Sequence, residues 1–159
     1  MTTQVAPAPH EVKHRGLITA SVMVAMIMVI LDMTIANVAL PHMQASLGAA
    51  QDTITWVLTS YIVAAAIATP ITGWLSDNIG RKRLFIICIV GFVATSALCG
   101  TAFTLSEMVF FRILQGAFGA ALAPLSQSVI IDINPRERQG QAMALWGAGI
   151  MVGPIVGPR

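Results

Sequence analysis

The sequence Gly73-Trp74-Leu75-Ser76-Asp77-Asn78-Ile79-Gly80-Arg81-Lys82-Arg83 is a polar segment between two apolar runs, each long enough to cross a bilayer. Asp77 falls at the end of the first run, where the negative end of a helix dipole disfavours a carboxylate, so it needs a positive partner. Gly80 has the backbone freedom to let Arg81 fold back toward Asp77. The segment therefore predicts a turn between two membrane helices. A solvated, positively charged loop is the alternative.

The composition is that of a membrane protein. Hydrophobic residues make up 56% of the chain and charged residues 10%, whereas soluble domains carry about a quarter charged residues. The formal net charge is only +2, and the basic residues lie in short clusters between apolar runs. A nucleic-acid partner is therefore excluded.

The cysteines and histidines predict neither a disulfide nor a metal site. Cys88 and Cys99 are eleven positions apart in one apolar run, which on a helix separates them by roughly 16 Å, so they cannot bridge each other there. His10, His14 and His42 have no carboxylate or cysteine cluster nearby. No nucleophile–base constellation or phosphate-binding loop appears either, so we expect no cofactor and no enzyme.

Five apolar runs predict an all-α membrane domain that follows a disordered cytoplasmic tail at residues 1–16. The runs cover residues 17–40, 54–75, 84–103, 108–131 and 141–158. The first run is too long for the core of a cleaved signal peptide, and no small-residue cleavage site follows it promptly.

The distribution of basic residues predicts the orientation in the membrane. The loops Pro41 to Asp52 and Thr104 to Glu107 hold no lysine or arginine. All seven membrane-flanking basic residues fall on the opposite side, namely Lys13, Arg15, Arg81, Lys82, Arg83, Arg136 and Arg138. The N-terminus is therefore predicted to be cytoplasmic. Because transporters are built from repeated three-helix units, five spans suggest the beginning of a longer transporter chain.

Two charged residues, Asp32 and Arg112, lie well inside apolar runs. A charge at membrane depth costs about 3 kcal/mol on insertion scales, which makes both functional candidates. Asp32 lies roughly 13 Å and Arg112 roughly 7 Å from the outer surface, a difference that a long arginine side chain covers. We expect the two to meet in a water-accessible cavity, where proton binding to Asp32 competes with its pairing to Arg112. A fixed pair that only joins the first and fourth helices is the alternative.

The order of residues in the opening segment resembles the signature between the second and third helices of major facilitator superfamily transporters. The residues that carry the resemblance are Gly73, Asp77, Gly80, Arg81 and Lys82. The resemblance implies a helical bundle in which these residues form a conformational gate.

Two further stretches match more specific signatures of that superfamily. Leu31 to Pro41, which contains Asp32, resembles the first-helix signature of its fourteen-helix drug:proton antiporter branch. Arg112 to Ala121 resembles the fourth-helix signature, whose arginine the family uses in proton coupling. The resemblance implies proton-coupling roles for Asp32 and Arg112. Small residues for helix packing explain the glycines and alanines here, but they do not explain Arg112.

The fifth run carries Gly149, Gly153 and Gly157 at a spacing of four, which places them on nearly one helix face, and Pro158 follows. This resembles the antiporter signature of the family, a kink in the fifth helix that closes the cytoplasmic leak path of exporters. It favours export over uptake. Arg159 stands where the family usually has an apolar residue.

Taken together, the stretches are similar to the inner-membrane subunits of the Emr-type tripartite multidrug pumps. The resemblance implies a bacterial inner-membrane antiporter that exchanges protons for hydrophobic or amphipathic compounds, and that hands them to a periplasmic adaptor and an outer-membrane channel. The alternatives are proton-coupled uptake and a membrane subunit that only anchors or assembles a complex.

Overall fold

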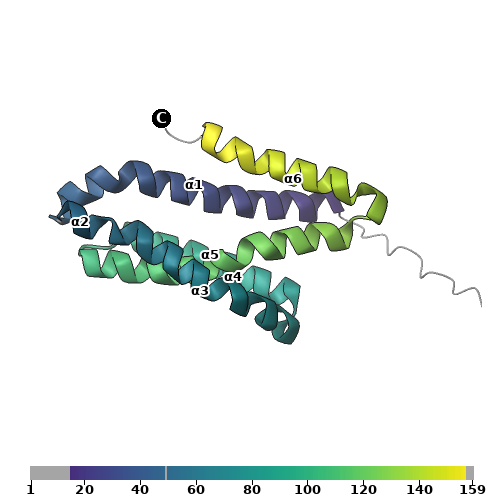
Figure 1. Cartoon of the computed structure of the whole chain (residues 1–159), viewed down its shortest axis with the longest axis horizontal. Helices are drawn as coiled ribbons and strands as arrows, with labels where there is room; N and C mark the ends of the chain where they lie inside the picture. The colour runs from purple at the N-terminus through teal and green to yellow at the C-terminus, as the bar shows by residue number, and fades with distance from the viewer. Residues whose placement is uncertain (1–14, 49, 157–159) are drawn as a thin grey trace, which may run out of the picture.

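The computed structural model describes residues 15–48 and 50–156, and these fold into helices joined by short turns (Figure 1). The elements are α1 (Arg15–Leu47), α2 (Gln51–Ile54), α3 (Trp56–Ile79), α4 (Arg81–Gly100), α5 (Leu105–Ile133) and α6 (Arg136–Val156). The all-α fold class is thus confirmed. Residues 1–14 of the predicted tail lie outside the described residues.

Four helices are long and apolar enough to cross a membrane in the part of the chain that the structure describes. They are the helices at Gly16–Ala45, Asp52–Ile79, Arg81–Gly100 and Leu105–Ile133. The helix α6, which begins with Arg136, Glu137 and Arg138, is less apolar on average and is not among them. The fifth span therefore stays a prediction.

Each of the five long helices extends beyond the apolar run that predicted it, at one end or at both. The prediction that a loop begins after Pro41 is wrong, because α1 continues through the proline as far as Leu47. A membrane helix tolerates proline, whose missing N–H costs one backbone hydrogen bond that surrounding groups compensate. At the opposite end of the bundle, Asp132 belongs to α5 rather than to a loop, and the opening segment is helical as far as Ile79.

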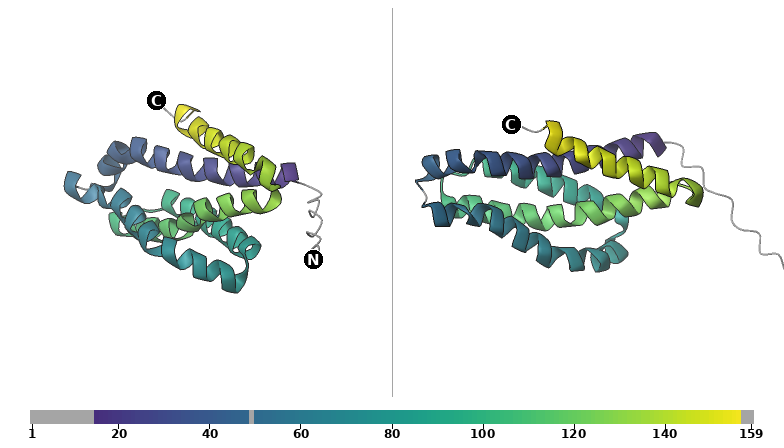
Figure 2. Two further views of the ribbon diagram at one scale, coloured as in Figure 1. Left: turned by 45° about the vertical axis from the view of Figure 1, so that its right-hand side comes forward. Right: turned by 45° about the horizontal axis from the view of Figure 1, so that its top comes forward.

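The helix α5 is the centre of the bundle and packs along both α3 and α4, while α1 contacts α5 and α6 (Figure 2). Close packing of α3 and α5 depends on Gly116, where an added Cβ atom would overlap the carbonyl oxygen of Tyr61. One turn later, a Cβ at Gly119 would lie 2.7 Å from the Tyr61 hydroxyl. Small residues at such positions let helix backbones approach closely.

The connections gather at two ends of the bundle. The start of α1, the α3–α4 junction and the α5–α6 junction lie at one end, and the α1–α3 and α4–α5 connections lie at the other (Figures 1 and 2). The α3–α4 junction is the single residue Gly80, whose φ of 91° is a left-handed conformation that favours glycine. The opposite end carries a capping box at the start of α5, formed by Thr104 and Glu107.

Candidate functional site

The structure joins Asp32 and Arg112 in an ion pair between α1 and α5. Arg112 Nη1 donates to Asp32 Oδ2 at 2.8 Å. The side chains are 14% and 7% exposed respectively, so the pair is largely shielded from solvent. A buried pair of this kind is held in place by the cost of leaving either charge alone.

Three polar groups from α4 and α5 support the pair. Ser96 Oγ donates to Asp32 Oδ1 at 3.3 Å, so both carboxylate oxygens accept hydrogen bonds. Gln115, which is fully buried, accepts from Arg112 Nη1 at 3.1 Å through Oε1. The thiol of Cys99 donates to the same oxygen, with a sulfur–oxygen distance of 3.6 Å. These groups on α4 and α5 therefore fix the geometry of the pair between α1 and α5.

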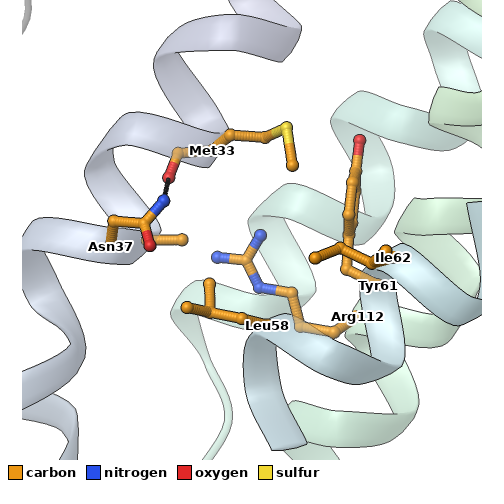
Figure 3. Close-up of a pocket in the computed structure, with 7 residues that line it drawn as sticks. Met33, Asn37, Leu58, Tyr61, Ile62 and Arg112 are labelled. Atoms are coloured by element: carbon orange, nitrogen blue, oxygen red, sulfur yellow. Dashed lines mark hydrogen bonds between the residues drawn. The ribbon is translucent and has the colours of Figure 1, made fainter. Parts of the chain in front are cut away.

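Cavities border the pair on different sides. One, of about 380 Å³, is lined by both Asp32 and Arg112 together with Ser96 and Cys99. A second, of about 330 Å³, is lined by Asp32, by apolar side chains of α1 and by Phe92. The third, of about 60 Å³, includes Arg112 but not Asp32. Figure 3 shows the Arg112 guanidinium reaching into that third space between α1 and α3.

The predicted pairing of Arg81 with Asp77 is wrong. Arg81 Nη1 donates to Asp132 Oδ2 and forms an ion pair with it across the α4–α5 interface. Arg81 is the first residue of α4, after the turn at Gly80, and Asp132 lies in the last turn of α5. Asp77 is exposed, and no ion pair joins it to any residue in the described ranges.

Part of the predicted gate borders a cavity of about 310 Å³ between α3 and α5. Gly73 and Arg81 line it, with hydroxyl groups from both helices. Lys82 is exposed in the first turn of α4. The structure therefore places the gate residues at one end of the bundle, around the junction of α3 with α4.

The glycines of the predicted fifth-helix signature are only partly described. Gly149 lies where α6 meets α1, because a Cβ added there would overlap the side chain of Met23. Gly153 falls within α6. Gly157 and Pro158 lie outside the described residues.

Sequence reasoning missed Ser96, Gln115 and Asp132 as members of these two sites. Gln115 carried a signal, since an amide three residues after a buried arginine lies on the same helix face. Asp132 carried a weaker signal: it is an acidic residue at the end of an apolar run, on the side of the membrane where the basic clusters are predicted to lie. Ser96 gave none, because a single serine is common in membrane helices.

The structure is a bundle of membrane-capable helices with a buried charge pair, and similar proteins give its class. Residues 22–159 match the family model described as Major Facilitator Superfamily. The chain belongs to this family, and with four membrane-capable helices it is an integral membrane protein.

The chain is similar to proteins named for multidrug export, multidrug resistance and fatty acid resistance. It is 46% identical to "Multidrug export protein EmrB" of Haemophilus influenzae, over 89% of this chain and 28% of that protein. It is 40% identical to "Probable multidrug resistance protein EmrY" of Escherichia coli, over 98% of this chain and 30% of that protein. It is 45% identical to "Fatty acid resistance protein FarB" of Neisseria gonorrhoeae, over 89% and 28%. The chain spans less than a third of the length of these relatives.

A solved structure shows the same fold. The bacterial homologue of the human lysosomal transporter Spinster, in an inward-facing and unoccupied conformation, superposes with a TM-score of 0.74 at 22% sequence identity. The match covers 88% of this chain and 29% of that one. Membership of the Major Facilitator Superfamily agrees with the expectation that the chain is not an enzyme.

Proposed function

We propose that these residues are the N-terminal part of a proton-coupled antiporter that exports hydrophobic or amphipathic compounds. The observation that carries the proposal is the buried Asp32–Arg112 ion pair beside cavities that open between the helices. The export and resistance proteins among its relatives support the direction of transport and the substrate class.

The ion pair is suited to proton coupling because a proton and Arg112 compete for the same carboxylate. When Asp32 binds a proton it loses its charge, and Arg112 is left with a weaker hydrogen-bond partner. An uncompensated charge in the bundle is costly, so protonation favours a conformation in which Arg112 finds other partners or water. The carboxylate borders two cavities, and these are the proposed route by which protons and substrates reach it.

The gate is proposed to be a latch between α4 and α5, formed by Arg81 and Asp132. Both side chains are about half exposed, at 49% and 52%, and exposed pairs contribute at most about 1 kcal/mol. A weak latch suits a contact that opens in every transport cycle. Gly80 supplies the pivot, and the exposed Asp77 and Lys82 are available to exchange partners when the latch opens.

Export rather than uptake is favoured by the close contact of α6 with α1 at Gly149. A tight seal between these helices blocks a leak path, as the antiporter signature implies. The proposed location is the bacterial inner membrane, with the N-terminus and the Arg81 end of the bundle in the cytoplasm. A periplasmic adaptor and an outer-membrane channel are the proposed partners.

The test is Asp32→Asn in the complete protein, reconstituted in vesicles with an imposed proton gradient. We expect proton-driven export to be lost while membrane insertion and folding persist, because asparagine keeps the shape but carries no titratable group. Asp52→Asn, at an exposed position of α2, is the matched control and should export normally. Undiminished export by the Asp32 variant would remove this carboxylate from the mechanism.

A second variant separates coupling from a purely structural pair. Asp32→Asn combined with Arg112→Gln leaves no buried charge, so a protein that needs the pair only to join α1 and α5 should regain activity. The antiporter proposal expects the double variant to be stable but uncoupled. Full recovery of proton-driven transport would favour the alternative in which the pair only joins the two helices.

A further inference from the structure

The two oxygens of the Asp32 carboxylate have partners of unequal strength. Oδ2 accepts a hydrogen bond of 2.8 Å from the Arg112 guanidinium, and the charged donor makes this bond strong. Oδ1 accepts a hydrogen bond of 3.3 Å from the Ser96 hydroxyl, which is long for a contact between two oxygens and therefore weak. A proton that binds Asp32 consequently meets less competition at Oδ1 than at Oδ2.

The cavity of about 380 Å³ beside Asp32 is polar and leads toward one end of the bundle. Gly100 and Ala102, at the α4–α5 connection, line it together with Met43 near the end of α1. That end of the bundle is the proposed outer one (Figure 1). The polar residues that line the cavity are Asp32, Ser96, Cys99 and Arg112. Because a water needs roughly 15 Å³, several waters fit between this end and Asp32.

The cavity of about 330 Å³ follows the opposite half of α1 and is apolar. Val24, Ile27 and Met28 line it from α1. Apart from Asp32 and Ser96, every lining residue in the described part of the chain is apolar. A hydrated proton loses much of its solvation among such side chains. Of the two cavities, the polar one is therefore the better route for a proton.

Ser96 borders both cavities and contacts the carboxylate. A hydroxyl group donates one hydrogen bond and accepts two, so Ser96 can accept from a water while it donates to Asp32. Thr95, the preceding residue, is placed differently, since its hydroxyl donates to the carbonyl oxygens of Gly91 and Phe92 on its own helix. Ser96 is thus the hydroxyl of α4 that connects the polar cavity with Asp32.

We infer that Ser96 is a proton relay that loads Oδ1 of Asp32 from the polar cavity. This inference rests on the proposed function, for which it names a further residue. A water that carries an excess proton transfers it to Ser96 Oγ while the original hydroxyl proton moves from Oγ to Oδ1. One O–H bond of Ser96 breaks as another forms, so the serine is unchanged, the water becomes neutral and Asp32 loses its charge.

The relay explains how a shielded ion pair is protonated. Arg112 stays bonded to Oδ2 during the transfer, so the pair does not have to separate before the proton arrives. Besides Asp32, the ionisable groups that face this site are Arg112 from α5, Cys99 from α4 and Tyr61 from α3. At neutral pH a guanidinium is ordinarily charged and a thiol or phenol is ordinarily neutral. Asp32 is therefore the group that gains the proton.

The experiment follows protonation of Asp32 by time-resolved infrared spectroscopy of the complete protein in detergent, after a rapid fall in pH. The signal is the carbonyl band of the protonated acid that disappears in Asp32→Asn. Ser96→Thr and Ser96→Val are the matched variants, because both side chains are β-branched and of similar size but only threonine has a hydroxyl.

We expect protonation to be at least about ten-fold slower in Ser96→Val than in the parent protein, and within about three-fold of the parent rate in Ser96→Thr. Thr95→Val removes the neighbouring hydroxyl and should leave the rate unchanged. Equal rates in Ser96→Thr and Ser96→Val would overturn the inference, because they would show that the hydroxyl at this position is not used.

A second pair of variants tests the route and leaves Ser96 in place. Gly100→Phe fills the polar cavity from α4, at a position where an added Cβ meets no atom within 4 Å. Val24→Phe enlarges an exposed side chain that lines the apolar cavity. We expect Gly100→Phe to slow protonation of Asp32 several-fold and Val24→Phe to leave it unchanged. A Gly100→Phe protein that protonates at the parent rate, or a Val24→Phe protein that is slowed as much, would contradict the route.

The infrared result is independent of the transport test. Lost export in Asp32→Asn together with slow protonation in Ser96→Val supports both proposals. Lost export with equal protonation rates in Ser96→Thr and Ser96→Val keeps proton coupling and overturns the relay. Intact export with slow protonation in Ser96→Val removes the coupling role and keeps the relay. If Asp32→Asn removes no carbonyl band, the relay is overturned whatever the export result.

Discussion

The bundle holds two arginine–aspartate pairs that differ mainly in depth. Arg112 and Asp32 lie inside the bundle, with side chains 7% and 14% exposed, and Ser96 and Gln115 complete their hydrogen bonding. Arg81 and Asp132 lie at one end, with side chains 49% and 52% exposed and no further side-chain partner in the described part of the chain. The same two residue types therefore serve as a fixed internal group and as a loose surface contact.

Depth sets what each pair does energetically. In the interior, removing one partner leaves a charge that is largely shielded from water, so the pair resists change unless a proton arrives. At the surface, either charge is rehydrated when the pair opens, and salt screens the attraction. The first arrangement suits a proton sensor and the second suits a gate.

The largest expected effect comes from a substitution that breaks the internal pair. Arg112→Ala in the complete protein should lower the free energy of unfolding by about 3–5 kcal/mol, because Asp32 is then buried without its counter-ion. Arg81→Ala is the matched control and should change it by at most about 1 kcal/mol. Denaturant unfolding in mixed micelles measures both. Equal losses of free energy of unfolding in the two variants would contradict the view that depth in the bundle distinguishes the two pairs.

The next effect tests whether the internal pair depends on close backbone packing beside it. Gly116→Ala should cost about 1–3 kcal/mol, since the new methyl group must displace the α3 backbone at Tyr61. Gly147→Ala on α6 meets no atom within 4 Å and should be neutral or slightly stabilising. Thermal unfolding of the two variants checks this, and a Gly116→Ala protein as stable as the parent would rule out the tight approach of α3 and α5.

A smaller effect concerns the groups that hold Arg112. Gln115→Leu should cost about 1–2 kcal/mol, because it removes an acceptor from a buried charged donor. Ser96→Ala removes a longer hydrogen bond, of 3.3 Å, to Oδ1 of Asp32 and should cost less. If Ser96→Ala lowers the free energy of unfolding more than Gln115→Leu does, the aspartate rather than the arginine needs the supporting hydrogen bond.

The internal pair was predictable from sequence, while the partner of Arg81 was not. Asp32 and Arg112 stand out because charges inside apolar runs are costly, and their depths along two spans differ by less than an arginine can reach. Arg81 has a carboxylate four residues away, at Asp77, and sequence proximity favoured that pairing. The direction in which α4 leaves Gly80 decides otherwise, and it depends on tertiary packing against α5. The support from Ser96 and Gln115 likewise depends on how α4 and α5 meet.

The smallest expected effect concerns the surface pair, and its salt dependence is what distinguishes it from the internal one. A double-mutant cycle with Arg81→Gln and Asp132→Asn should give a coupling energy of about 0.2–1 kcal/mol at low salt. Raising the salt concentration to about 1 M shortens the screening length to about 3 Å, so this coupling should largely vanish. The corresponding cycle for Asp32 and Arg112 should hardly change, because ions do not enter the bundle interior. A surface coupling that persists in high salt would mean that Arg81 and Asp132 are shielded in the complete protein, and a shielded pair is too strong to serve as the gate proposed here.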